Sequence, residues 1–159
     1  MKRAKTTTLV ARAAAVGAVA GMRSMSPPAM VGRRLARHAL GRSRAEWMSS
    51  RRTGRVLALM AAGEIVADKM PGIPSRTYPP ALAMRAMTGA ATAAALARAS
   101  GGHRWHGALA GAAGAVAGAH VARRLREGAV RRTGWSDRAV GVIEDAAALG
   151  LGWLVCRRR

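Results

Sequence analysis

The amino-acid sequence predicts an all-α fold, an integral membrane helical bundle of four or five spans with broken or re-entrant segments. The first observation behind this prediction is composition. Half of the 159 residues are hydrophobic, yet the chain has no Phe and 19 Gly, and its apolar residues are mostly Ala. Membrane helices associate through such small residues, whereas a soluble core is filled by large side chains. The second observation is that the arginines cluster between the apolar stretches and at both ends.

The net charge of +20 has two physical interpretations. Arginines can displace counterions from nucleic-acid phosphates, or they can flank membrane helices. Because the charge is concentrated between apolar runs and the chain lacks aromatic stacking platforms, the membrane interpretation is favoured and nucleic acid is an unlikely partner. Cys156 is the only cysteine, and the four histidines form no zinc-type motif, so no disulfide, metal or cofactor is expected.

The first predicted helix follows a basic start and runs from Thr8 to Met22. Residues 1–20 resemble a signal peptide, but Arg12 interrupts the apolar run, so an uncleaved helix is favoured and cleavage stays open. Pro27 and Pro28 must end this helix, because proline cannot continue one. They can open another, with Ser26 as its cap. The resulting short helix over 29–40 favours an interfacial or re-entrant segment.

The rest of the chain alternates apolar and basic segments within one membrane domain, residues 1–159. The short helix 56–67 is the natural candidate for a segment that fails to cross, so the topology stays open. Further helices are predicted over 79–99, 106–122 and 138–156. Basic loops are predicted at about 41–55 and 123–138, a proline-rich connection at 71–80, and a basic tail at 157–159.

Ionisable groups inside the apolar helices are the first candidate site. Glu64 and Asp68 lie one turn apart on one helix face, and Lys69 follows directly. Glu144 and Asp145 lie well inside the last apolar stretch. Such groups are costly in a membrane and usually pair with one another or line a path for ions or protons. The alternative is a set of structural ion pairs that orient the helices. The available partners of opposite sign are Arg12, Arg23 and Arg85.

The break at residues 24–28, beginning with Ser24, is the second candidate site. Interrupted membrane helices place helix ends inside the bundle, where N-terminal amides can hold an anionic group. A separate feature is a glycine stripe with spacings of four, three and four, the pattern of close helix packing. Its members are Gly107, Gly111, Gly114 and Gly118.

The order of several motifs resembles that of a family of small bacterial multi-pass membrane proteins, catalogued as domain of unknown function 4126. The resemblance covers about residues 10 to 155, and its most distinctive part is G-E-x-x-x-D-K-x-P, which begins at Gly63. It implies an integral membrane location and no assigned activity. The other matching motifs are Gly21-Met22-Arg23-Ser24, Pro28-Ala29, Pro74, Arg85, Gly89-Ala90 and Glu144-Asp145.

Two functions from different classes follow as hypotheses. The first is a transporter or channel-like protein of the cell (inner) membrane. Its ion- or proton-handling carboxylates would be Glu64, Asp68 and Glu144, and Arg23 with Ser24 would line the helix break. The alternative is a structural or assembly subunit that docks another membrane protein, or a second copy, through the glycine stripe. An enzyme is not expected, because no nucleophile–base arrangement is visible. The lipid bilayer is the one partner that both hypotheses require.

Overall fold

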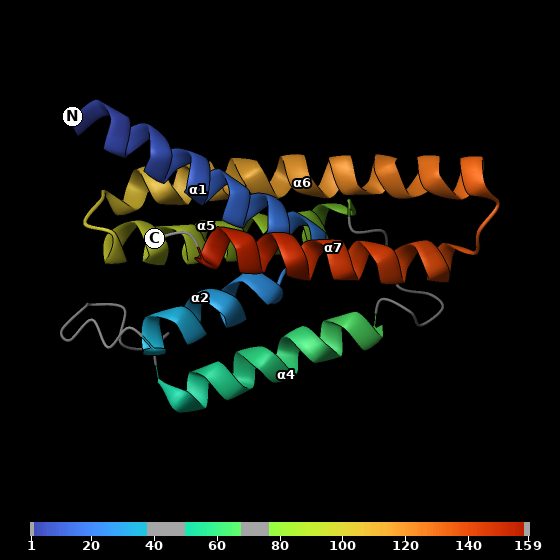
Figure 1. Ribbon diagram of the computed structural model, residues 1–159, viewed down its shortest axis with the longest axis horizontal. Helices are drawn as coiled ribbons and strands as arrows, with labels where there is room; N and C mark the ends of the chain where they lie inside the picture. Colours follow the sequence, from blue (N-terminus) through green and yellow to red (C-terminus); the bar gives the residue numbers. More distant parts are fainter. Residues whose placement is uncertain (1, 38–49, 68–76, 158–159) are drawn as a thin grey trace.

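The fold is entirely helical in the computed structural model, which describes residues 2–37, 50–67 and 77–157. The expected all-α class is therefore confirmed for this part of the chain, which contains no strand. Figure 1 shows the helices lying side by side along one direction. They are α1 (Lys2–Met22), α2 (Ser26–Arg37), α4 (Arg51–Ala67), α5 (Pro79–Ala99), α6 (Arg104–Thr133) and α7 (Asp137–Arg157).

Helices α1, α5 and α6 form the centre of the molecule, and they pack through small residues. Ala20, Ala93, Ala115 and Ala119 are completely buried between them. Larger buried side chains gather in one cluster, where Val16 and Leu96 meet residues of α2. Small side chains bring the helix backbones close together, which is the packing mode expected from the composition.

The glycine stripe of α6 lies against these neighbouring helices. A Cβ atom at Gly107 would stand 2.7 Å from the backbone oxygen of Ala93, and Gly111 likewise has no room for a side chain. Gly114 and Gly118 face the α1 backbone. All four glycines therefore serve contacts within the chain. Docking of another protein through this stripe, the alternative function expected from the sequence, is not supported because α1 and α5 already cover it.

The remaining helices surround this centre. From the end of α1 the chain reverses, and α2 runs back toward the end of the molecule where α1 begins (Figure 1). Helix α4 packs mainly on α2 and lies at the outside, whereas α7 contacts α1, α2 and α6.

Two basic stretches expected as loops are partly helical. Helix α6 continues to Thr133 and ends where Gly134 adopts φ 66°, so the loop expected over 123–138 is wrong over most of its length. Arginine and glutamate are good helix formers, and Arg123 pairs with Glu127 one turn later. Likewise α4 begins at Arg51 rather than after residue 55, because the Ser50 hydroxyl accepts a hydrogen bond from the amide of Thr53.

One described helix is long and apolar enough to cross a membrane, the segment Asp137–Cys156 of α7. Residues Thr7–Met22 of α1 form a shorter apolar stretch. The same property occurs in buried helices of soluble proteins and in signal sequences. The expected number of four or five spans is therefore not confirmed by helix length and apolarity.

Candidate functional site

The candidate site is the break between α1 and α2, where two helix ends meet in the interior. Helix α1 ends at Met22 and α2 begins at Ser26. A helix end leaves backbone groups without partners, carbonyls at its C-terminus and amides at its N-terminus. Here the carbonyls of Gly21 and Met22 each accept a hydrogen bond from Nη1 of Arg85, at 3.1 Å. A guanidinium from α5 thus satisfies the negative end of α1.

Glu64 from α4 satisfies the other side of the break. Its Oε1 accepts hydrogen bonds from the amide of Ser24 at 2.8 Å and from the Ser24 hydroxyl at 2.7 Å. Its Oε2 accepts one from the amide of Met25 at 2.9 Å. The sequence predicted a local cap at Ser26, but the Ser26 hydroxyl is buried and neither accepts nor donates a hydrogen bond within the described structure. The amides of the break itself, those of Ser24 and Met25, are instead bound by the carboxylate of Glu64 from α4.

Arg85 and Glu64 also pair with each other. Nη2 of Arg85 lies 3.4 Å from Oε1 of Glu64, and the two side chains are only 8% and 13% exposed. A buried charge is tolerated when it is paired and hydrogen-bonded. Each charge here has both an opposite charge and backbone partners. Arg85 on α5 binds the C-terminus of α1, and Glu64 on α4 binds the segment that leads into α2. Their ion pair therefore connects the two sides of the break.

A second ion pair lies beside the break. Arg23 donates to Oδ1 of Asp145 on α7, and the Arg23 side chain is only 2% exposed. Arg23 immediately precedes Ser24, so both pairs attach to the same short segment of chain. Arg85 and Asp145 are six and eight residues into their helices, about 9 and 12 Å from the helix starts. The site is thus set back from the end of the bundle.

Sequence reasoning assigned Glu144 to this network, and the structure places it elsewhere. Oε2 of Glu144 lies 3.6 Å from Nη1 of Arg126, and Arg126 also bonds both carboxylate oxygens of Asp137. Sequence reasoning missed Arg126 because residues 123–138 were expected to form a loop. A helix continued to Thr133 brings it beside the start of α7. Of the two adjacent acidic residues, Asp145 is the one that reaches the break.

Two further expected members fall outside this description. Asp68 and Lys69 lie outside the residues that the structure describes. Arg12 is eleven residues before Arg23 on α1, about 16 Å away along the helix, and lies near Arg34 and Cys156 instead. In the described part of the chain no three His, Cys, Asp or Glu side chains gather in a way that could hold a metal ion.

The break therefore unites five of the residues singled out from the sequence: Arg23, Ser24, Glu64, Arg85 and Asp145. Comparison with curated proteins and with solved structures finds no match. Comparison with family models finds one over residues 10–157, described as a domain of unknown function (DUF4126). The match includes every residue of the break and nearly the whole chain, which therefore belongs to the DUF4126 family.

Proposed function

We propose that this protein is a multi-pass protein of the inner membrane, of the transporter or channel-like class, and that the helix break is its proton-handling site. The observation that carries the membrane placement is the distribution of side-chain size. The fully buried residues are mostly alanines, whereas Leu59 on α4 and Leu109 on α6 are 72% and 69% exposed. Soluble proteins rarely leave large apolar surfaces open to water. Lipid accepts them at no cost.

The helix lengths support the same placement. Helices α5 and α7 have 21 residues each, about 31 Å, which matches the hydrocarbon thickness of a bilayer. The apolar stretch Thr7–Met22 of α1 is shorter, about 24 Å. In α6 the segment 105–122 carries no Arg, Lys, Asp or Glu and is about 27 Å long. Helices α2 and α4 are shorter, with 12 and 17 residues. Helix α2 fits a re-entrant segment, and α4 fits a partial crossing of the layer.

Exposed aromatic residues lie at both ends of this layer. Trp105 is the second residue of α6, and Trp153 lies near the end of α7. Tyr78 precedes α5, and Trp135 follows α6. The start of α6 and the end of α7 point toward one side of the bundle, and the start of α5 and the end of α6 toward the other (Figure 1). All four side chains are more than half exposed. Trp and Tyr favour the two membrane–water interfaces. Their positions beside helix ends support a layer that these helices cross.

The role of the site follows from what holds the break closed. The carboxylate of Glu64 accepts from two amides and a hydroxyl, and it faces Arg85. Protonation would remove the negative charge and leave one oxygen as a hydroxyl donor. The amide of Met25 or that of Ser24 would then lose its acceptor, and Arg85 would lose its counter-charge. Proton binding at Glu64 therefore loosens the two helix ends, which is how a proton could drive a conformational change.

The Arg23–Asp145 pair has a different part in this proposal. It ties the break segment to α7 and does not depend on the proton at Glu64. With it intact, the segment keeps one attachment while the Glu64 attachment opens and closes. The four charges balance as two pairs, so a proton added at Glu64 leaves one positive charge uncompensated in the interior.

Two experiments test the proposal in order. First, a tagged copy should stay in the membrane pellet after an alkaline carbonate wash and should need detergent to dissolve. Release into the supernatant would refute the membrane placement.

Second, purified protein in liposomes that enclose a pH-sensitive dye should equilibrate an imposed pH gradient faster than empty liposomes do.

The second experiment has a matched pair of variants. Glu64→Gln removes the titrating group at the break and should reduce the rate to that of empty liposomes. Glu127→Gln also neutralises a glutamate paired with an arginine, but on the exposed part of α6, and should leave the rate unchanged. Equal rates for the wild type, for Glu64→Gln and for empty liposomes would refute proton movement. An unchanged, fast rate in Glu64→Gln would refute the role of Glu64.

A further inference from the structure

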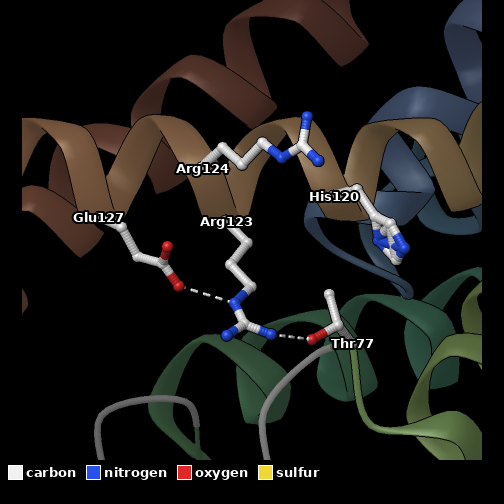
Figure 2. A pocket seen from close by; sticks show the side chains of 5 residues that line it. All are labelled: Thr77, His120, Arg123, Arg124 and Glu127. Carbon is white, nitrogen blue, oxygen red and sulfur yellow. Dashed lines mark hydrogen bonds and ion pairs between the residues drawn. The ribbon is translucent and has the colours of Figure 1, made fainter.

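An open polar groove lies where the uncharged part of α6 ends. It has a volume of about 290 Å³ and is lined by Thr77, His120, Arg123, Arg124 and Glu127. Figure 2 shows Arg123 between Glu127 on its own helix and Thr77, which precedes α5, while Arg124 extends along α6 toward His120. This groove is separate from the helix break, and the proposed function makes no use of it.

Arg123 is held in a fixed orientation. Its Nε donates to Glu127 at 2.7 Å and its Nη1 to the hydroxyl of Thr77 at 2.6 Å. The hydrogen bond from Arg123 lowers the pKa of Glu127, so this carboxylate stays ionised and keeps Arg123 in place. Arg124 is exposed and makes no hydrogen bond within the described part of the chain. One guanidinium is thus positioned and the other is available.

The groove continues an apolar stripe of the same helix. Leu109, Ala113, Val116, His120 and Arg124 follow one another at spacings of four, three, four and four, and all are exposed. Residues at these spacings lie on one face of a helix. The face therefore changes from apolar to basic along its length, with Arg124 about 22 Å from Leu109. An amphiphile with an acyl chain and an acidic head would match this order.

The charge of the groove also specifies its occupant. Two guanidiniums and one carboxylate leave one positive charge with the histidine neutral, and a phosphodiester carries one negative charge. Arginine is well suited to phosphate because its guanidinium presents several donors in a planar fork. Basic pockets at the ends of membrane helices bind acidic lipid headgroups in this way.

We infer that this groove is a binding site for an anionic phospholipid, whose phosphodiester lies on Arg124 and Arg123 and whose acyl chain lies along Val116 and Leu109. The inference rests on the membrane placement proposed above. His120 lies between the two regions and can donate a hydrogen bond to the headgroup. The headgroup would thereby connect α6 to the segment that precedes α5.

The test uses the full-length protein in detergent, with bound lipids counted by native mass spectrometry. Phosphatidylglycerol should bind about fivefold more tightly than phosphatidylcholine or phosphatidylethanolamine of the same acyl chains, because the net charge of the headgroup is the difference between them. Arg124→Gln should weaken phosphatidylglycerol binding about fivefold to tenfold. Arg131→Gln removes the same charge from the same helix outside the groove and should change binding by less than about twofold.

Three outcomes would overturn the inference. Equal binding of phosphatidylglycerol and phosphatidylethanolamine would exclude selection of an anionic headgroup. Equal losses in Arg124→Gln and Arg131→Gln would assign the effect to general surface charge. Displacement of phosphatidylglycerol by millimolar inorganic phosphate would identify free phosphate as the ligand. These results leave the carbonate test untouched, so failure of the lipid site is distinguishable from failure of the membrane placement.

Discussion

Replacing Glu64 with glutamine removes one charge from the helix break without changing the size of the side chain. The carboxylate has three hydrogen-bond donors, from Ser24 and Met25, and an ion-pair partner in Arg85. A glutamine oxygen can keep the two bonds from Ser24, as bonds to a neutral acceptor. Its amide nitrogen then faces the amide of Met25, and two donors oppose each other.

The expected cost is set by the charge that remains. Removing one partner of a buried ion pair destabilises a protein by about 3 to 5 kcal/mol, since the other charge stays buried without compensation. The Arg85 side chain is only 8% exposed, so this range applies. Loss of the acceptor for Met25 is part of that cost and is not added to it. Glu127→Gln breaks an exposed pair at i, i+4 and should cost much less, because solvent screens a pair of exposed charges.

The measurement is unfolding by sodium dodecyl sulfate in mixed micelles, followed by circular dichroism, for the wild type and both variants. A double variant, Glu64→Gln with Arg85→Gln, completes the cycle. It should be more stable than the sum of the single effects predicts, by about 1 to 3 kcal/mol, because no uncompensated charge is left. A loss below about 1 kcal/mol in Glu64→Gln, or strict additivity in the double variant, would refute the idea that this pair holds the break together.

Three further predictions concern packing, a helix end and topology. Gly111→Ala should destabilise the protein by about 1 to 3 kcal/mol, because the added methyl group meets α5. Gly150→Ala adds a methyl group that meets nothing within 4 Å and should stabilise the protein by about 0.5 to 1 kcal/mol. The same unfolding titration measures both. Gly134→Ala should cost about 1 kcal/mol, since Gly134 ends α6 at φ 66°. In a cysteine-free background, Ser100→Cys and Ser136→Cys should react with an impermeant maleimide from opposite sides of the membrane, and labelling from one side would show that α6 does not cross.

Local patterns predicted the helices well where a breaker marks the end. The helix over 79–99 was predicted with the bounds that α5 has, because prolines open it and two glycines follow it. The break after Met22 was predicted for the same reason. Basic composition misled the prediction over 123–133, since charge does not oppose helix formation in residues that pair at i, i+4. The start of α4 was missed because the Ser50 cap lies within an arginine-rich stretch.

The sequence predicted which kinds of residue form the site, but it did not predict which acidic side chain pairs with which arginine. The cost of ionisable groups in apolar helices singled out Glu64, Arg85 and Arg23 without any structure. It also singled out the adjacent Glu144 and Asp145, but the network was assigned Glu144, and the structure places Asp145 there. Which acid meets which base depends on how α4, α5 and α7 are arranged around α1, and no local pattern encodes that arrangement. Glu144 and Asp145 differ by one residue, about 100° around the helix, and so face different arginines.

The helix break and the buried charges explain each other. Under the proposed membrane placement, an interrupted helix exposes amides and carbonyls that a bilayer cannot hydrate, so the protein itself must supply their partners. Neutral side chains satisfy such groups more weakly than charged ones do. Arg85 meets the carbonyls and Glu64 meets the amides, and each charge offsets the burial of the other. An unbroken helix here would need neither residue. The proposed function gives the interruption of α1 a role, because a break held by the charge of Glu64 can open when that charge is removed.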